Sequence, residues 1–174
     1  MPAQEIYLIR HATAEATSAS RNDRDRNLTS AGIDEALCCA RCLQALGIVV
    51  DSIRTSPIAR ARQTAEIIAH HYDLPVIVDE RVGPGFDVAV MQNFAAARGV
   101  RALAFVSHEP DIDWIVWSTT GIKQQTQTAS VTRLEPAGSR WKRAFYLAPP
   151  AQAAVLAHGD PWSALTGSGE PLDG

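Results

Sequence analysis

Short apolar runs with the character of β-strands alternate with helical patterns along most of the chain. Four such runs stand in the stretches EIYLIR, VVDSIRTSP, LPVIVDE and VRALAFVSHEP. Helical patterns follow them: from Leu28 to a stop at Gly47, from Ser56-Pro57 as N-cap and first helical position to about His71, over residues 88–98, and after Pro110. Strands that alternate with helices form parallel sheets covered on both faces. We therefore predict an α/β fold, a three-layer α/β/α sandwich with a mostly parallel central sheet.

The length and composition of the chain fit one globular domain. It has 174 residues, of which 46% are hydrophobic and 20% charged, as in ordinary folded proteins. The stretches TQTASVTRLE and RWKRAFYLA predict a late hairpin across PAGS. From Pro149 the content of Ala, Pro and Gly rises. We expect a single domain over residues 1–150 and a C-terminal extension or tail over residues 151–174.

The charge and hydropathy of the sequence indicate which classes of partner the protein has and where in the cell it is located. The formal net charge is -3, so the chain lacks the polybasic field that nucleic acids or anionic lipids attract. It has no apolar run of the roughly 20 residues that span a bilayer, and its first residues lack the pattern of a signal peptide. We predict a cytoplasmic protein with no nucleic-acid or membrane partner. The sequence makes no prediction about oligomeric state.

The three cysteines crowd into the stretch ALCCARCL, at positions 38, 39 and 42. A Cys-x-x-Cys pair is typical of redox motifs or of half a zinc site, but no second pair follows at ligand spacing. The segment has a helical pattern in which Ile33, Leu37 and Leu43 share one face, with Cys39 at its margin and Cys38 and Cys42 on the wetter side. We interpret the cysteines as incidental residues of a helix.

Two tryptophans follow Pro110 at helical spacing. Trp114 and Trp117 are three positions apart, which places them on one side of the expected helix. Core packing is the more common role of such a pair, so we predict that both are buried rather than stacked on a ligand.

Polar side chains stand where three of the predicted strands end. Arg10 and His11 follow the first strand, Ser56-Pro57 follows the second with Arg60 four residues on, and Ser107-His108 follows the apolar run that ends at residue 107. In open α/β sheets ligands bind at the carboxyl ends of the strands. A single histidine at a strand end is usually structural, but three such features in order predict one shared crevice.

The residue types in this crevice suit a phosphoryl group. The guanidinium groups of Arg10, Arg60 and Arg26 can hold phosphate or carboxylate through paired hydrogen bonds, without a metal. Neighbouring positive charges disfavour a protonated imidazole, so His11 should be neutral and able to attack phosphorus. His108 can then donate a hydrogen bond to a phosphoryl oxygen in the transition state.

The motifs LIRHATAE, LTSAG, TSPIARARQTAEII and FVSHEP together resemble the histidine phosphatase superfamily, with Ala12 where its Arg-His-Gly motif has glycine. The short chain looks most like the SixA-type phosphohistidine phosphatases. The resemblance implies a phosphoglycerate mutase-like fold, no metal and no organic cofactor. It implies that His11 is the phosphorylated nucleophile, that Arg10, Arg60 and, less directly, Arg26 bind the phosphoryl group, and that His108 is the second pocket histidine.

The substrate and the general acid stay open at this stage. Without a large helical insertion the pocket should stay open, which suits a phosphohistidine on a partner protein. The alternatives are a small phosphate ester, such as a sugar or nucleotide phosphate, and a non-catalytic phosphate-binding module. Glu80 after the third strand and Glu109 after His108 are both candidates for the general acid, and each is also a residue type that is commonly just solvated.

Overall fold

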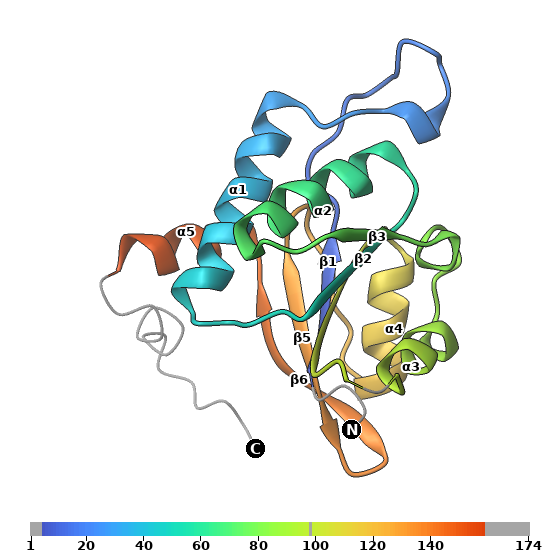
Figure 1. Ribbon diagram of the computed structural model, residues 1–174, viewed down its shortest axis with the longest axis vertical. Helices are drawn as coiled ribbons and strands as arrows, with labels where there is room; N and C mark the ends of the chain where they lie inside the picture. The colour runs from blue at the N-terminus through green and yellow to red at the C-terminus, as the bar shows by residue number, and fades with distance from the viewer. Residues whose placement is uncertain (1–4, 98, 159–174) are drawn as a thin grey trace.

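The computed structural model describes residues 5–97 and 99–158. Its centre is a six-stranded sheet with the strand order β3-β2-β4-β1-β5-β6 (Figure 1). The pairs β1–β4, β2–β4 and β2–β3 are parallel, and the pairs β1–β5 and β5–β6 are antiparallel. The strands are β1 (Glu5–Arg10), β2 (Ser52–Thr55), β3 (Val76–Val78), β4 (Ala102–Ser107), β5 (Val131–Ala137) and β6 (Arg140–Leu147). The α/β prediction and the late hairpin are confirmed.

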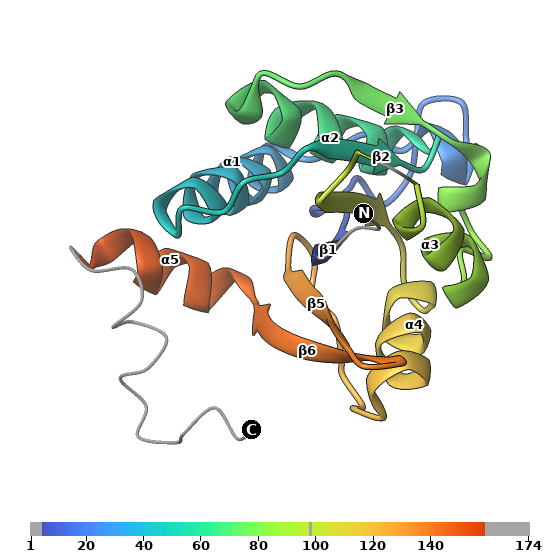
Figure 2. The ribbon, with the colours of Figure 1, turned by 60° about the horizontal axis from the view of Figure 1, so that its bottom comes forward.

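Helices cover both faces of the sheet. One face packs against α1, α2 and α5, and the other against α3 and α4 (Figures 1 and 2). The helices are α1 (Ser30–Ala45), α2 (Ala59–Tyr72), α3 (Val88–Ala95), α4 (Asp111–Thr120) and α5 (Pro149–Ala157), with two short 3-10 turns, η1 (Asp23–Asp25) and η2 (Glu80–Val82). None of the helices in the described ranges is long and apolar enough to cross a membrane.

The alternation of side chains along β1 divides the hydrophobic core into two parts. Tyr7 and Ile9 point to the α1 and α2 side, whereas Ile6 and Leu8 point to the α3 and α4 side. All four are fully buried. A central strand buried on both faces is a continuous apolar run, which explains why the sequence stays hydrophobic until the polar Arg10 at its end.

Helix α1 begins and ends as its sequence predicts, but it is turned about its axis. Thr29 caps it by accepting a hydrogen bond from the backbone N–H of Gly32, and Gly47 follows it with a φ of 68°. Ile33 is 44% exposed and Cys42 is fully buried, so the expected face was wrong for these two residues. Gly32 explains the rotation: a Cβ there would lie 2.0 Å from the carbonyl oxygen of Thr13. The helix lies against backbone at this position, where any side chain would clash.

Two further local predictions were wrong. Ser56 does not cap α2, because the N-cap is Ile58, although the Ser56 hydroxyl accepts a hydrogen bond from the Ile58 backbone N–H. Trp114 and Trp117 are 59% and 42% exposed, with ring centroids 4.8 Å apart. Helix α4 instead buries Ile112, Ile115 and Val116 in the core. Its apolar residues exceed what one face can bury, and the branched aliphatic ones occupy that face.

Helix α5 continues the domain beyond the boundary expected at residue 150. It packs beside α1 (Figure 2), and within it Val155 and Gln152 are buried. The Gln152 side-chain amide donates to the carbonyl oxygens of Ala129 and Leu147, at 2.7 and 3.1 Å. The rest of the expected tail, residues 159–174, lies outside the described residues.

Candidate active site

The register of the parallel strands brings the two predicted histidines together. β1 pairs with β4 so that Arg10 lies opposite Ser107, where both strands end. His11 and His108 are therefore the next residues on neighbouring strands. The backbone N–H of His11 donates to the carbonyl of Ser107 at 3.1 Å, and the centroids of the two imidazole rings are 5.2 Å apart.

Two contacts define the state of the His11 ring. Its Nδ1 lies 2.8 Å from the carbonyl oxygen of Ala12, which can only accept, so Nδ1 carries the proton. The Nε of Arg60 donates to Nε2 at 3.2 Å, so Nε2 holds a lone pair. Burial lowers the pKa of His11 to about 4, and the charges of Arg60, Arg10 and Arg26 act in the same direction, whereas the bond to Ala12 opposes them. At neutral pH His11 is a neutral imidazole, the form that can act as a nucleophile.

Arg60 and Arg26 already hold an anionic group, the side chain of Asp23. Arg60, on the first turn of α2 and 7% exposed, donates from Nη1 to the carbonyl and from Nη2 to Oδ2 of Asp23, at 2.9 and 3.1 Å. Arg26 donates from Nε to Oδ1 of the same carboxylate at 2.8 Å. Planar guanidinium groups arranged around a carboxylate suit a phosphate equally well. The structure thus brings two of the three predicted arginines, Arg60 and Arg26, to one anion-binding position beside His11.

His108 is buried and anchored on one side of its ring. Its Nε2 lies 2.8 Å from the hydroxyl oxygen of Ser56, and its Nδ1 has no hydrogen-bond partner within the described part of the chain. Burial lowers the pKa of His108 to about 3, and the neighbouring His11 and Arg60 lower it further. The Ser56 hydroxyl, which accepts from Ile58, has its own proton to donate to Nε2. We therefore assign the ring proton of His108 to Nδ1, where it is free to meet a phosphoryl oxygen.

Arg10 reaches the segment before β5. Its Nη1 donates to the carbonyl oxygen of Thr126 at 2.6 Å, and its Nε is buried without a partner among the described residues. A buried, unpaired N–H of a charged group is costly unless something fills the position. An oxygen of a bound phosphoryl group is one acceptor that would do so, and the role of Arg10 in binding it stays a prediction.

Ala12 stands at the position of the glycine in the Arg-His-Gly motif, and its backbone is not strained. The backbone φ angle of Ala12 is not positive, and its side chain is fully buried against Leu28, Ala36 and Ala129. Its backbone N–H donates to the hydroxyl of Thr64 on α2 at 3.0 Å. The loop after His11 is therefore held in place with a methyl group at this position.

The structure separates the two candidate general acids. Glu109 is half-buried, with a buried Oε1 that accepts no hydrogen bond. Burial and the adjacent Asp113 raise the pKa of Glu109 to about 8, although Arg10 opposes this. Glu80 has a side chain that is 78% exposed, and it pairs with the exposed Arg24 at 3.5 Å. Glu109 is therefore suited to carry a proton at neutral pH.

Comparison with known proteins shows the family of the chain. Residues 6–83 match the model of the histidine phosphatase superfamily, branch 1. An uncharacterized protein of Picosynechococcus is 32% identical over 145 residues, covering 78% of this chain and 87% of the relative. The chain belongs to the histidine phosphatase superfamily.

Two further relatives show where the chain stands in this superfamily. Phosphohistidine phosphatase SixA of Escherichia coli strain K12 is 28% identical over 117 residues, covering 64% of this chain and 71% of the relative. The solved structure of the protein histidine phosphatase SixA complexed with tungstate has a TM-score of 0.76 and 23% identity, and covers 84% of this chain and 97% of the other. The sheet and its helices have the phosphoglycerate mutase-like fold, and the chain is a phosphatase of this superfamily.

Several side chains of this site were not expected from the sequence. Asp23 and Thr126 contact the predicted Arg60 and Arg10 from distant parts of the chain, Asp113 in turn accepts from Thr126, and none of the three stands in a pattern that marks a ligand. Within the described ranges, no group of three or more His, Cys, Asp or Glu side chains could hold a metal ion.

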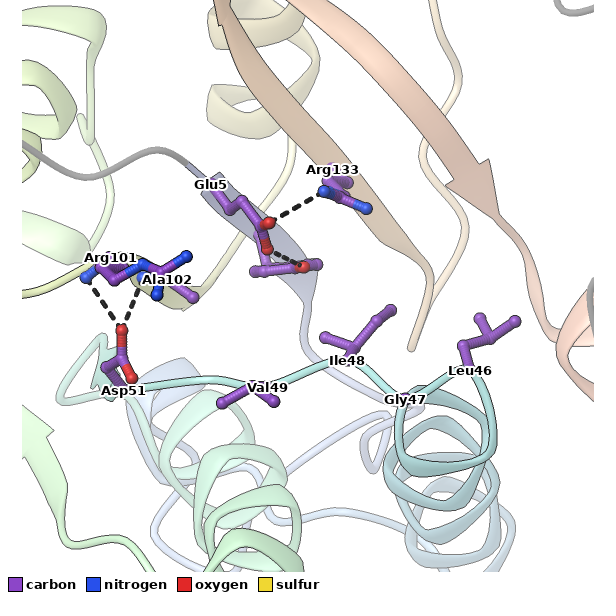
Figure 3. Close-up of a pocket in the computed structure, with 10 residues that line it drawn as sticks. Glu5, Leu46, Gly47, Ile48, Val49, Asp51, Arg101, Ala102 and Arg133 are labelled. Carbon is purple, nitrogen blue, oxygen red and sulfur yellow. Dashed lines mark hydrogen bonds and ion pairs between the residues drawn. The ribbon is translucent and has the colours of Figure 1, made fainter.

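A separate cavity of about 360 Å³ lies at the opposite end of β1 from His11 (Figure 3). The two carboxylates that line it already bond to the protein itself. Asp51 accepts from the backbone N–H groups of Arg101 and Ala102, and Glu5 accepts from Arg133. No histidine lines it, so it is not a second phosphoryl-transfer site of the same kind.

Proposed function

We propose that this phosphatase hydrolyses phosphohistidine on a partner protein, through a phosphohistidine intermediate at His11. The observation that carries the proposal is the state of the His11 ring, neutral, with the proton on Nδ1 and the lone pair on Nε2 beside two anion-binding arginines. The similarity to SixA supports the choice of substrate.

The first step is the attack of the His11 Nε2 lone pair on phosphorus. The Nε of Arg60, which donates to Nε2 in the free enzyme, then turns to a phosphoryl oxygen, and Nη2 exchanges the Asp23 carboxylate for another oxygen of the same group. As the new P–N bond forms, the bond from phosphorus to the substrate imidazole breaks, and its electron pair stays on that imidazole nitrogen. The Glu109 carboxyl supplies a proton to this nitrogen, and the Nδ1–H of His108 stabilises the charge on the phosphoryl oxygens.

The second step returns the enzyme to its starting state. The Glu109 carboxylate takes a proton from a water molecule as the water oxygen attacks the phosphorus of phosphorylated His11. The bond from phosphorus to Nε2 breaks, its electron pair returns to the ring, and inorganic phosphate leaves. One carboxyl group can serve both steps because each step leaves it in the protonation state that the next one needs.

An open site supports a protein substrate over a small one. Near the strand ends the described chain carries the loop with η1, the turn with η2 and the segment with Thr126 before β5, and the described ranges hold no helices beyond those of the two layers (Figure 1). Enzymes for small metabolites commonly close a lid over them to exclude water. A phosphorylated side chain on a folded partner needs the reverse, an entrance that stays accessible.

A small phosphate ester is the second candidate, and one observation favours it. The oxygen that leaves from an alkyl ester is a poor leaving group without a proton, and Glu109 is held protonated at neutral pH. A phosphohistidine depends less on such an acid because its P–N bond is labile. The two candidate substrates react through the same two steps and differ in the part of the molecule that carries the phosphoryl group.

The test compares substrates in one assay. Phosphate release is measured from a histidine-phosphorylated phosphotransfer domain, from a panel of sugar and nucleotide phosphates and from an aryl phosphate, with EDTA present throughout. The proposal predicts that the phosphohistidine protein has a kcat/KM larger by several orders of magnitude. A higher value for any small ester would overturn the substrate assignment. His11→Ala is the control, with turnover abolished and tungstate binding retained.

A further inference from the structure

One segment of the chain contacts Arg10 at both its backbone and its side chain. The backbone N–H of Arg10 donates to the carbonyl of Ser130 at 3.2 Å, and its carbonyl oxygen accepts from the backbone N–H of Ala129 at 3.2 Å. At the far end of the residue, Nη1 donates to the carbonyl oxygen of Thr126 at 2.6 Å. The segment 126–130 therefore determines where the guanidinium group of Arg10 lies.

The bond at Nη1 also determines which edge of the guanidinium group stays available. The N–H donors of this group form a rigid planar fork, so a bond at Nη1 fixes the direction of the edge formed by Nε and Nη2. The Nε of Arg10 is buried and has no hydrogen-bond partner among the described residues. The carbonyl of Thr126 thus orients the edge on which Arg10 is expected to bind a phosphoryl oxygen.

Thr126 is in turn held by one carboxylate. It is 4% exposed, and its backbone N–H donates to Asp113, at 3.1 Å to Oδ1 and 3.3 Å to Oδ2. Its hydroxyl donates to the same Oδ1 and accepts from the Nε2 of Gln124 at 2.8 Å. Hydrogen bonds to an ionised group are the stronger ones. Asp113 is therefore the main restraint on the position of Thr126.

The position of Asp113 on α4 connects Arg10 to the other side of the site. Helix α4 begins at Asp111, and the backbone N–H of Ile112 donates to the carbonyl of His108 at 3.2 Å. Asp113 lies in the first turn of this helix, where the macrodipole favours a carboxylate. It thereby joins the segment that holds Arg10 to the helix that starts beside His108.

We propose that Asp113 is a positioning residue, which fixes Thr126 so that the guanidinium group of Arg10 presents its Nε edge to a bound phosphoryl group. This role rests on the proposed function, in which the site beside His11 binds a phosphoryl group. Asp113 acts through Thr126 and Arg10 and makes no contact of its own with the phosphoryl group. Because Arg10 is already held in place in the free protein, binding does not have to order this long side chain.

The test is a double-mutant cycle on tungstate binding, measured by calorimetry with the whole protein. We expect Arg10→Ala to weaken binding about 10- to 100-fold, the loss of charge-assisted hydrogen bonds. Asp113→Ala should weaken it about 3- to 10-fold, the cost of ordering one long side chain on binding. The double variant should bind no more weakly than Arg10→Ala alone, because Asp113 acts only through Arg10. Losses that add, or an Asp113→Ala affinity equal to that of the wild type, would overturn the proposal.

Two substitutions of Thr126 test the middle of the connection. Thr126→Val loses the hydroxyl bond to Asp113 and keeps the backbone bonds, so tungstate should bind about 2- to 3-fold more weakly. Thr126→Ser keeps the hydroxyl and should restore the wild-type affinity. Equal affinities of the Val and Ser variants would contradict the role of the hydroxyl in fixing Arg10.

Asp111→Asn is the matched control, since this carboxylate on the same turn accepts instead from the backbone N–H of Gly85 at 2.8 Å. Tungstate affinity should be unchanged in this variant. A loss equal to that of Asp113→Asn would mean that any loosening of α4 weakens the site, and would overturn the proposal. Asp113→Asn keeps the size of the side chain and an acceptor for one of the two Thr126 donors, so it takes the place of Asp113→Ala in the cycle where the latter does not fold.

Tungstate binding needs neither turnover nor a partner protein, so the cycle separates this inference from the proposed function. The phosphohistidine assay can fail while the coupling between Asp113 and Arg10 stands. Conversely, turnover of the phosphohistidine protein together with additive losses of tungstate affinity would leave the proposed function in place and remove the positioning role of Asp113.

Discussion

The Nε of Arg60 donates a hydrogen bond to Nε2 of His11 across 3.2 Å. Since a guanidinium group has no lone pair to offer, this contact alone fixes Nε2 as the unprotonated nitrogen of the ring. The arginine that is expected to hold phosphate thus also keeps the expected nucleophile in its reactive form. Phosphate binding and nucleophile activation are coupled in one side chain.

The pH dependence of the reaction should report this state of His11. The neutral ring is the reactive one, and its pKa is lowered to about 4, so kcat/KM should stay constant from neutral pH down to about pH 5 and fall below it. A profile measured with nitrophenyl phosphate isolates this limb from the general acid. A fall of kcat/KM around pH 6.5, the ordinary range of histidine, would show that His11 is not desolvated as the structure has it.

Arg60→Lys tests whether the guanidinium shape matters beyond its charge. Lysine keeps the positive charge but loses the fork that contacts His11 and the anion together. We expect tungstate to bind about 10- to 100-fold more weakly, the equivalent of one or two charge-assisted hydrogen bonds, and kcat/KM to fall by at least as much. Calorimetry gives the affinity. Arg62→Lys is the control, because Arg62 is exposed and pairs with Glu66 on the same helix, and tungstate binding should not change in this variant.

Asp23→Asn should strengthen the inhibition by inorganic phosphate. In the free protein the Asp23 carboxylate bonds to both Arg26 and Arg60, so phosphate has to displace it. The Asp23 side chain is 66% exposed, so we expect a modest effect, a Ki about 2- to 5-fold lower. An unchanged or higher Ki would mean that the carboxylate does not compete with phosphate. Asp25→Asn, in the same turn, serves as the control.

Gly32→Ala should destabilise the fold and disturb the site. The added methyl carbon would lie 2.0 Å from the Thr13 carbonyl oxygen, two residues after His11. We expect the free energy of unfolding to fall by about 2 kcal/mol or more, as in overpacked cores, and kcat to fall as well. Gly47→Ala, where nothing lies within 4 Å but φ is 68°, should cost about 1 to 2 kcal/mol with unchanged kcat. Urea unfolding and a standard assay read out both variants.

The sequence predicts those parts of the site that local pattern determines. His11, His108 and the Ser56 turn were expected at strand ends because a buried parallel strand is apolar until it leaves the sheet, and the register then aligns those ends. Arg60 was expected beside them because it follows the turn by one helical turn. These relations depend on residues that are neighbours in the chain or on adjacent strands.

The missed features depend on contacts between distant segments. Thr126 meets Arg10 from 116 positions away, and Asp23 meets Arg60 from 37, and no local period marks either. The prediction that Trp114 is buried was wrong for a similar reason. Spacing shows that residues share a side of a helix, but not which side packs inward. The inward side of α4 is determined by its packing against the sheet, which buries the aliphatic residues of the helix.

The measurement that tests the central claim most directly is the capture of phosphorylated His11. The enzyme is mixed rapidly with a histidine-phosphorylated protein labelled in its phosphoryl group and quenched in alkali, in which phosphohistidine survives. We predict label on the peptide that contains His11, lost on acid treatment and absent from His11→Ala. Turnover with no label on this peptide, or undiminished turnover by His11→Ala, would contradict the covalent mechanism.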